Sequence, residues 1–124
     1  MNGVKIEKTI LVVDDDPDIL DAVQILLESE GFKVLTSTKG IDVDAISIQQ
    51  MPDLILLDVL LSGYDGRKIA KKLKMQNITK NIPVVMMSAH PTARNDIKEY
   101  LADDFISKPF DIDYLMNKIH LYLH

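Results

Sequence analysis

The stretch that decides the fold is Thr9-Ile10-Leu11-Val12-Val13-Asp14-Asp15-Asp16-Pro17, close to the start of a chain of 124 residues. Residues 9–13 form a continuous β-branched and apolar run, which is typical of a strand buried on both faces. Asp16 and Pro17 have the chemistry of a helix N-cap and of the first helical position. A buried strand that leads directly into a helix indicates a parallel α/β sheet.

The same alternation of short apolar runs and longer amphipathic segments continues to the end of the chain. Residues 41–50 fit either a strand or a helix, and the rhythm on both sides favours a helix. Residues 62–66 are rich in turn formers and are expected to be a loop. Further strands are expected at 32–36, 53–57, 83–87 and 105–106. Helices are expected after Asp16 and at 41–50, 67–75 and 91–101, the last with Ile97 and Leu101 inward. Asp111 is expected to cap a final helix that buries Leu115 and Ile119. The pattern therefore predicts a five-stranded parallel sheet with five helices on its two faces.

Length and composition indicate one domain over residues 1–124, with an ordered core at about 9–123 and an N-terminal tail at 1–8. Hydrophobic residues make up 47% and charged residues 27% of the chain. No apolar run approaches the roughly 18 residues of a membrane span, and no secretory signal is visible. The absence of cysteine is compatible with the reducing cytoplasm, where we expect the protein. A net charge of −5 argues against direct binding of nucleic acid.

Polar side chains follow four of the expected strands. Asp14 and Asp15 come after the first, Asp58 after the third, Ser88 after the fourth and Lys108 after the fifth. Ligands of parallel α/β sheets bind at the carboxyl ends of the strands. If these strands are neighbours, their ends form one pocket with several carboxylates, a hydroxyl and an ammonium.

The chemistry of this set is specific. Clustered carboxylates repel one another unless a cation is present, and Mg²⁺ prefers oxygen ligands. A carboxylate at a strand end can act as a nucleophile and form an aspartyl phosphate. The charge of the incoming phosphoryl group would then be balanced by Mg²⁺, by Lys108 and by the Ser88 hydroxyl.

Five short motifs in order carry a resemblance to a known family: residues 10–17, Leu56-Leu57-Asp58, Asp65-Gly66, Met87-Ser88-Ala89 and Ser107-Lys108-Pro109-Phe110. Together they closely resemble the receiver domains of two-component response regulators, the CheY-like superfamily. The resemblance covers the chain from about Thr9 to its last helix. It implies a doubly wound, flavodoxin-like sheet of strand order 2-1-3-4-5. It also implies a signalling switch rather than an enzyme, with only self-catalysed phosphoryl transfer and dephosphorylation.

The resemblance assigns the phosphoacceptor and the metal ligands. Asp58 would accept the phosphoryl group and contact Mg²⁺, for which Mn²⁺ could substitute. Asp15 would be a direct metal ligand, Asp14 would bind the metal through water, and the backbone carbonyl of Leu60 would be a further ligand.

It also assigns the switch. Ser88 would contact the phosphoryl group, and Lys108 would pair with it or with unphosphorylated Asp58. Pro109 would follow a cis peptide bond. Phe105 would move inward when Ser88 is drawn to the phosphoryl group. The surface that changes would comprise the helix at 91–101, the strand at 105–106 and the helix after Asp111.

The implied partners are a histidine kinase or histidine phosphotransfer protein as the donor, and a downstream protein or output domain as the target. A phosphorylation-dependent homodimer is left open, because the last helix has Lys118 where the family usually has arginines. A stand-alone regulator and a receiver cut from a longer protein are both compatible with the sequence.

Two departures from the family pattern concern the loop after the phosphoacceptor. Ser62 replaces a common proline, which predicts a less rigid loop. Leu60 and His90 flank the expected pocket, and an apolar Leu60 could hinder an attacking water. We therefore expect a longer aspartyl-phosphate lifetime than in fast-cycling relatives.

Other classes of protein and of site fit these residues less well. A haloacid-dehalogenase-like phosphatase would need a second Asp where this chain has Leu60. A receiver fold that acts only in recognition would not need the intact acidic set. Asp16 is interpreted as a helix cap and Asp65-Gly66 as a turn. A basic run is interpreted as the solvated face of a helix rather than as a nucleic-acid patch: Arg67, Lys68, Lys71, Lys72 and Lys74.

Overall fold

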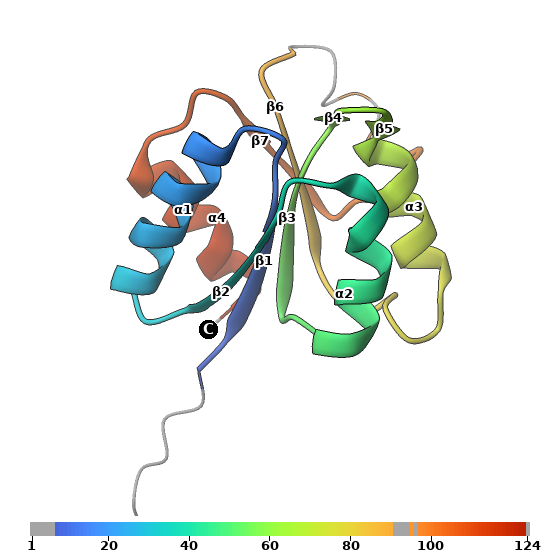
Figure 1. The fold of residues 1–124 in the computed structure, drawn as a ribbon, viewed down its shortest axis with the longest axis horizontal. Coiled ribbons are helices and arrows are strands. Elements are labelled where there is room, and N and C mark those ends of the chain that lie inside the picture. The colour runs from blue at the N-terminus through green and yellow to red at the C-terminus, as the bar shows by residue number, and fades with distance from the viewer. Residues whose placement is uncertain (1–6, 91–94, 96, 124) are drawn as a thin grey trace, which may run out of the picture.

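The structure, a computed structural model, describes residues 7–90, 95 and 97–123. Helices lie on both faces of a central sheet (Figure 1). The strands are β1 (Thr9–Val13), β2 (Lys33–Ser37), β3 (Leu54–Asp58), β4 (Leu60–Leu61), β5 (Tyr64–Asp65), β6 (Val84–Ser88) and β7 (Asp104–Ser107). The helices are α1 (Pro17–Ser29), the 3₁₀ turn η1 (Gly40–Asp42), α2 (Val43–Gln50), α3 (Gly66–Met75) and α4 (Ile112–Tyr122).

The main sheet is parallel throughout, and its strand order is β2-β1-β3-β6-β7. This order is the predicted 2-1-3-4-5, since β4 and β5 form a separate small hairpin. In register, Val13 of β1 lies beside Leu57 of β3, and Ser88 of β6 lies beside Ser107 of β7. The carboxyl ends of four neighbouring strands therefore meet at one edge of the sheet, as the sequence predicted.

Each face of the sheet has its own core, because side chains alternate along each strand. Ile10 and Val12 point into the core beneath α1 and α4, and Leu11 and Val13 point into the core beneath α2 and α3. Figure 1 shows the two helix pairs on opposite sides of the sheet. At roughly 1.5–3 kcal/mol for each fully buried aliphatic side chain, these cores hold the strand ends in fixed positions.

Aspartates begin three of the helices. The carboxylates of Asp16, Asp65 and Asp111 accept hydrogen bonds from backbone N–H groups in the first turns of α1, α3 and α4. The cap roles predicted for Asp16 and Asp111 are confirmed, and the predicted turn at Asp65-Gly66 is the start of α3.

Two segments differ from the sequence prediction. Residues 62–66 were expected to be a loop, but Leu60–Leu61 and Tyr64–Asp65 pair as a hairpin around a turn with Gly63 at φ 77°. The segment expected to be one helix from residue 41 begins as the 3₁₀ turn η1 and becomes α-helical at Val43.

The helix expected at 91–101 is only partly covered, since residues 91–94 and 96 lie outside the described residues. Residues 97–101 are turns, and the described part of the chain has four α-helices where five were expected. Ile97 packs against the core, as predicted. Leu101 was predicted to point inward, which is wrong: its side chain is 44% exposed. Its backbone has φ 63°, so the chain turns at this residue toward β7. The tail predicted at 1–8 also lies mostly outside the described residues.

Candidate functional site

The predicted site residues come together at the carboxyl edge of the sheet. Asp14 follows β1, Asp58 and Ser88 end β3 and β6, and Lys108 follows β7. A pocket of about 440 Å³ opens here. It is lined by Asp15, Asp58, Leu60, Ser88, Ala89, His90 and Lys108.

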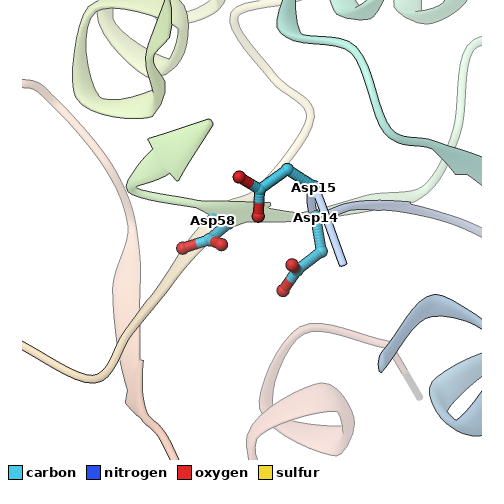
Figure 2. A group of neighbouring side chains, drawn as sticks. All are labelled: Asp14, Asp15 and Asp58. Atoms are coloured by element: carbon cyan, nitrogen blue, oxygen red, sulfur yellow. The ribbon is translucent and has the colours of Figure 1, made fainter. Parts of the chain in front are cut away.

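Three carboxylates form the acidic part of the site. Asp14, Asp15 and Asp58 each place a carboxylate oxygen within 4.8 Å of the other two (Figure 2). Asp14 is 1% and Asp58 is 7% exposed, whereas Asp15 is exposed. Such a cluster is electrostatically unfavourable without a cation, so the arrangement favours binding of a positive ion.

The Lys108 ammonium lies among these carboxylates. Its Nζ atom donates hydrogen bonds to Asp14 and, at 3.2 Å, to Asp58. Burial opposes the charged ammonium, but the hydrogen bond to Asp14 and the attraction of Asp58 outweigh it and raise the pKa of Lys108. The sequence predicted the pairing with Asp58, and the structure adds Asp14 as a second partner.

Asp58 lies in a partly dehydrated environment. Burial raises the pKa of its carboxyl, Lys108 opposes this effect and Asp14 adds to it. The Leu60 N–H also donates to Oδ1 of Asp58 at 3.3 Å. The carboxylate therefore has one oxygen oriented by the backbone and one oriented by Lys108, toward the open pocket.

The backbone of Asp58 is tightly packed against the start of α3. The Gly66 N–H donates to the Val59 carbonyl at 2.8 Å. A Cβ atom on Gly66 would lie 2.0 Å from the Asp58 carbonyl oxygen, so only glycine fits this position. Asp65-Gly66 thus sets the backbone position at the end of β3, a role that a turn motif alone does not reveal.

Ser88 and Phe105, the two residues of the predicted switch, are both buried. The buried Ser88 hydroxyl accepts the His90 N–H at 2.9 Å, which leaves its own proton for an acceptor in the pocket. Phe105 is 4% exposed and packs in the core beneath α2 and α3. The inward position of this ring is therefore the one that the structure describes.

Ser62 is a contact that the sequence did not predict. Its hydroxyl donates to Oδ2 of Asp15 at 3.2 Å and so helps to orient the exposed carboxylate. The signal in the sequence was only the departure from proline. The contact depends on the β4–β5 hairpin, which was expected to be a loop.

The residues present fit a hard divalent cation. Three carboxylates supply the oxygen ligands that Mg²⁺ prefers, and the open side of the pocket leaves room for water and phosphate oxygens. The close approach of Lys108 shows that positive charge is stabilised at this place.

Among the described residues, no helix is long and apolar enough to span a bilayer.

Comparison with known proteins identifies relatives of this chain. A family model described as "Response regulator receiver domain" matches residues 10–120. The RpaA protein of Synechocystis sp., a DNA-binding dual master transcriptional regulator, is 37% identical over 116 residues, which are 92% of this chain and 48% of that protein. The PhoB phosphate regulon regulator of Pseudomonas aeruginosa is 39% identical over 105 residues, which are 83% of this chain and 46% of that protein. The chain thus spans about half the length of these curated relatives.

Solved structures agree with this comparison. The chemotaxis protein CheY4 of Vibrio cholerae superimposes with a TM-score of 0.88 at 26% identity, covering 95% of this chain and all (100%) of that one. A response regulator from Chloroflexus aurantiacus superimposes with a TM-score of 0.89 at 28% identity, covering 94% of this chain and 98% of that one.

Proposed function

Because this chain belongs to the response regulator receiver domain family of two-component signalling, we propose that it accepts a phosphoryl group on Asp58. The proposal rests on one observation: the Asp58 carboxylate opens into a pocket that is also lined by the Asp15 carboxylate, an ammonium and a hydroxyl, with the buried Asp14 carboxylate close beside it. The donor would be a phosphohistidine of a histidine kinase or of a phosphotransfer protein.

The reaction requires few groups. A carboxylate oxygen of Asp58 attacks the phosphorus atom, the new P–O bond forms, and the P–N bond to the donor imidazole breaks with its electron pair going to nitrogen. Lys108 lies between Asp14 and Asp58 and is therefore close enough to pair with the oxygens of the transferred phosphoryl group. The Ser88 hydroxyl can donate a hydrogen bond to another of these oxygens.

Asp14 and Asp15 would hold Mg²⁺ together with Asp58 and the Leu60 carbonyl. When bound, the cation offsets the charge of the carboxylates and of the phosphoryl group. Lys108 balances part of the same charge in its absence, and this explains why a lysine can lie so close to the metal ligands.

An apolar groove beside the pocket fits the donor. It has a volume of about 350 Å³ and lies between α1 and the segment Lys108-Pro109-Phe110, with Ile19 and Leu26 on its α1 side. Lys108 lines both the groove and the phosphoacceptor pocket. A donor helix that packs in this groove would therefore bring its histidine next to Asp58.

The output surface would be formed by β7, α4 and residues 97–101. Lys118 and Tyr122 of α4 donate hydrogen bonds to Asp104 of β7 at 2.8 and 2.9 Å, so the two elements are coupled. Phosphorylation would favour one packing of this surface by drawing Ser88 toward the phosphoryl group, with Phe105 held inward. The phosphorylation-dependent homodimer and the cytoplasmic location considered above stay predictions.

The first test is the intact mass after incubation with acetyl phosphate and Mg²⁺. We expect one phosphoryl adduct that disappears with EDTA and in Asp58→Asn, and that persists in Asp113→Asn, an exposed aspartate of α4 that does not line the pocket. An adduct on Asp58→Asn would contradict the assignment. No adduct in any condition, with no response to beryllofluoride, would leave recognition as the only function.

The donor groove has its own test. Ile19→Asp should slow transfer from a phosphorylated phosphotransfer protein at least about tenfold, because it places a charge in an apolar interface. Phosphorylation by acetyl phosphate should be unchanged, since this small donor does not need the groove. Equal loss with both donors would show that the variant damages the pocket itself.

A further inference from the structure

A second groove lies between η1–α2 and α3. Its volume is about 440 Å³. Helices α2 and α3 cover the face of the sheet opposite to α1 and α4 (Figure 1). The α2–α3 groove is defined here by six of its lining residues: Ile41, Tyr64, Lys68, Ile69, Lys72 and Leu73. None of these six lines the phosphoacceptor pocket or the donor groove. Two carboxylates also line the α2–α3 groove, and each accepts a hydrogen bond within the domain, Asp44 from Gln76 and Asp65 from Arg67.

The floor and one rim of the α2–α3 groove are apolar. Leu73 is buried and Ile69 half-buried at its base. Ile41 is 63% and Tyr64 is 42% exposed at its rim, although both side chains are large. Exposed apolar side chains around a concave surface are a mark of an interaction site.

The other rim is positively charged. Helix α3 has five basic residues and no acidic one, in a chain whose net charge is −5. Arg67 pairs with Asp65 at 2.9 Å and Lys74 with Asp103 at 2.9 Å, so these two cations are used within the domain.

The two lysines of the groove are less engaged. Lys68 is exposed and makes no hydrogen bond or ion pair among the described residues, and its charge is the smallest of the contributions that lower the pKa of Asp65. Lys72 is 65% exposed and lies 3.7 Å from Asp44. The Asp44 carboxylate also accepts a shorter hydrogen bond, at 2.7 Å, from Gln76. An exposed pair at this distance contributes little, so Lys72 can turn to a partner at low cost.

We infer that the α2–α3 groove binds an acidic amphipathic helix of a partner protein. Lys68 and Lys72 are four residues apart and therefore lie one above the other on α3. Ile69 and Leu73 repeat this spacing next to them, so a charged row and an apolar row run in parallel over about one helical turn. A helix with apolar residues at i and i+4 and carboxylates beside them matches both rows.

A nucleic acid is the weaker match to the same cations. The acidic net charge opposes approach of a polyanion, whereas a short acidic segment meets only the local positive rim. The apolar floor would also be left without a partner by a phosphate backbone.

The test uses the isotope-labelled full chain and two synthetic peptides of about 18 residues, a length that supports a helix. One peptide has leucines at i, i+4 and i+7 with flanking glutamates, and in the matched peptide every glutamate is glutamine. We expect the acidic peptide to bind at least about tenfold more tightly, with NMR shift changes centred on Ile41, Tyr64 and Ile69. No phosphoryl group is needed, so the result is independent of the role of Asp58.

Charge reversal supplies the control. Lys68→Glu/Lys72→Glu should weaken binding of the acidic peptide at least about tenfold, and Lys33→Glu/Lys80→Glu, which changes exposed lysines elsewhere, should not. Equal affinity for the two peptides, no binding, or shift changes centred on another surface would overturn the inference. So would displacement of the acidic peptide by a single-stranded oligonucleotide, which would indicate a nucleic-acid site instead.

Discussion

Replacing Lys108 by methionine tests how the acidic cluster is stabilised. The substitution keeps the length of the side chain and removes its charge. The Lys108 side chain is 15% exposed, and those of its partners Asp14 and Asp58 are 1% and 10% exposed. The variant therefore leaves buried carboxylates without their cation.

The magnitude follows from the geometry. At the 3.2 Å separation of Lys108 Nζ and Asp58 Oδ2, the attraction is roughly 5 kcal/mol with an effective dielectric constant of about 20. Breaking a buried pair by removing one partner costs about 3–5 kcal/mol. We expect about 3 kcal/mol for Lys108→Met without metal, because Asp58 can take up a proton and relieve part of the repulsion.

Urea unfolding followed by far-ultraviolet circular dichroism measures this effect in EDTA and in Mg²⁺. Magnesium should reduce the loss to about 1 kcal/mol or less, since the ion supplies the missing positive charge and binds only the folded state. Lys33→Met, an exposed control, should change stability by less than about 0.5 kcal/mol in both conditions. Full stability of Lys108→Met in EDTA, or a loss that Mg²⁺ does not reduce, would refute the reasoning.

Four further substitutions or titrations probe the site and its surroundings. Burial raises the pKa of Asp58, so its ionised form lowers the stability of the fold as the pH rises above the ordinary carboxyl range. In urea unfolding, Asp58→Asn should therefore stabilise the metal-free protein at neutral pH by on the order of 1 kcal/mol, and destabilisation would contradict this. Gly66→Ala should cost about 2–3 kcal/mol of stability and lower phosphorylation by acetyl phosphate, because the new Cβ atom would collide with the Asp58 carbonyl oxygen. An unchanged urea unfolding midpoint would argue against that contact. Burial and Asp104 raise the pKa of Tyr122 to about 12, so the stability that the protonated phenol contributes is present below about pH 10 and is lost as the pH rises through 12. An ultraviolet titration compared with that of Tyr122→Phe should show ionisation of this phenol at about pH 12, and ionisation near the ordinary phenol value would refute the raised pKa. Leu60 is 66% exposed over the pocket, so Leu60→Asn should admit water and shorten the aspartyl-phosphate half-life several-fold, as measured by loss of the mass adduct; an unchanged half-life of seconds would exclude shielding by Leu60.

The positions of the strands and caps were readable from short stretches of sequence. The apolar runs at 9–13, 53–57 and 83–87 mark strands buried on both faces, which no other element of an α/β domain shows at that length. The observed strands differ from these bounds by at most one residue at either end. Asp16 capped α1 as expected, because the capping bond is made within the first turn and depends only on neighbouring residues.

The errors fell where distant contacts decide local structure. The β4–β5 hairpin was expected to be a loop, since two-residue strands have no periodicity to detect. Leu101 was expected to be buried because of its helical spacing from Ile97, but the chain turns there and exposes the side chain.

The sequence by itself determined which polar residues follow the strands and therefore that carboxylates, a hydroxyl and a lysine share one edge of the sheet. Only the tertiary structure decided how they touch. Lys108 reaches Asp14 across 94 positions of sequence, and Ser62 reaches Asp15 across 47. Such contacts depend on how the loops after the strands fold and pack against one another. No local pattern of residues encodes which side chains meet across so many positions of sequence.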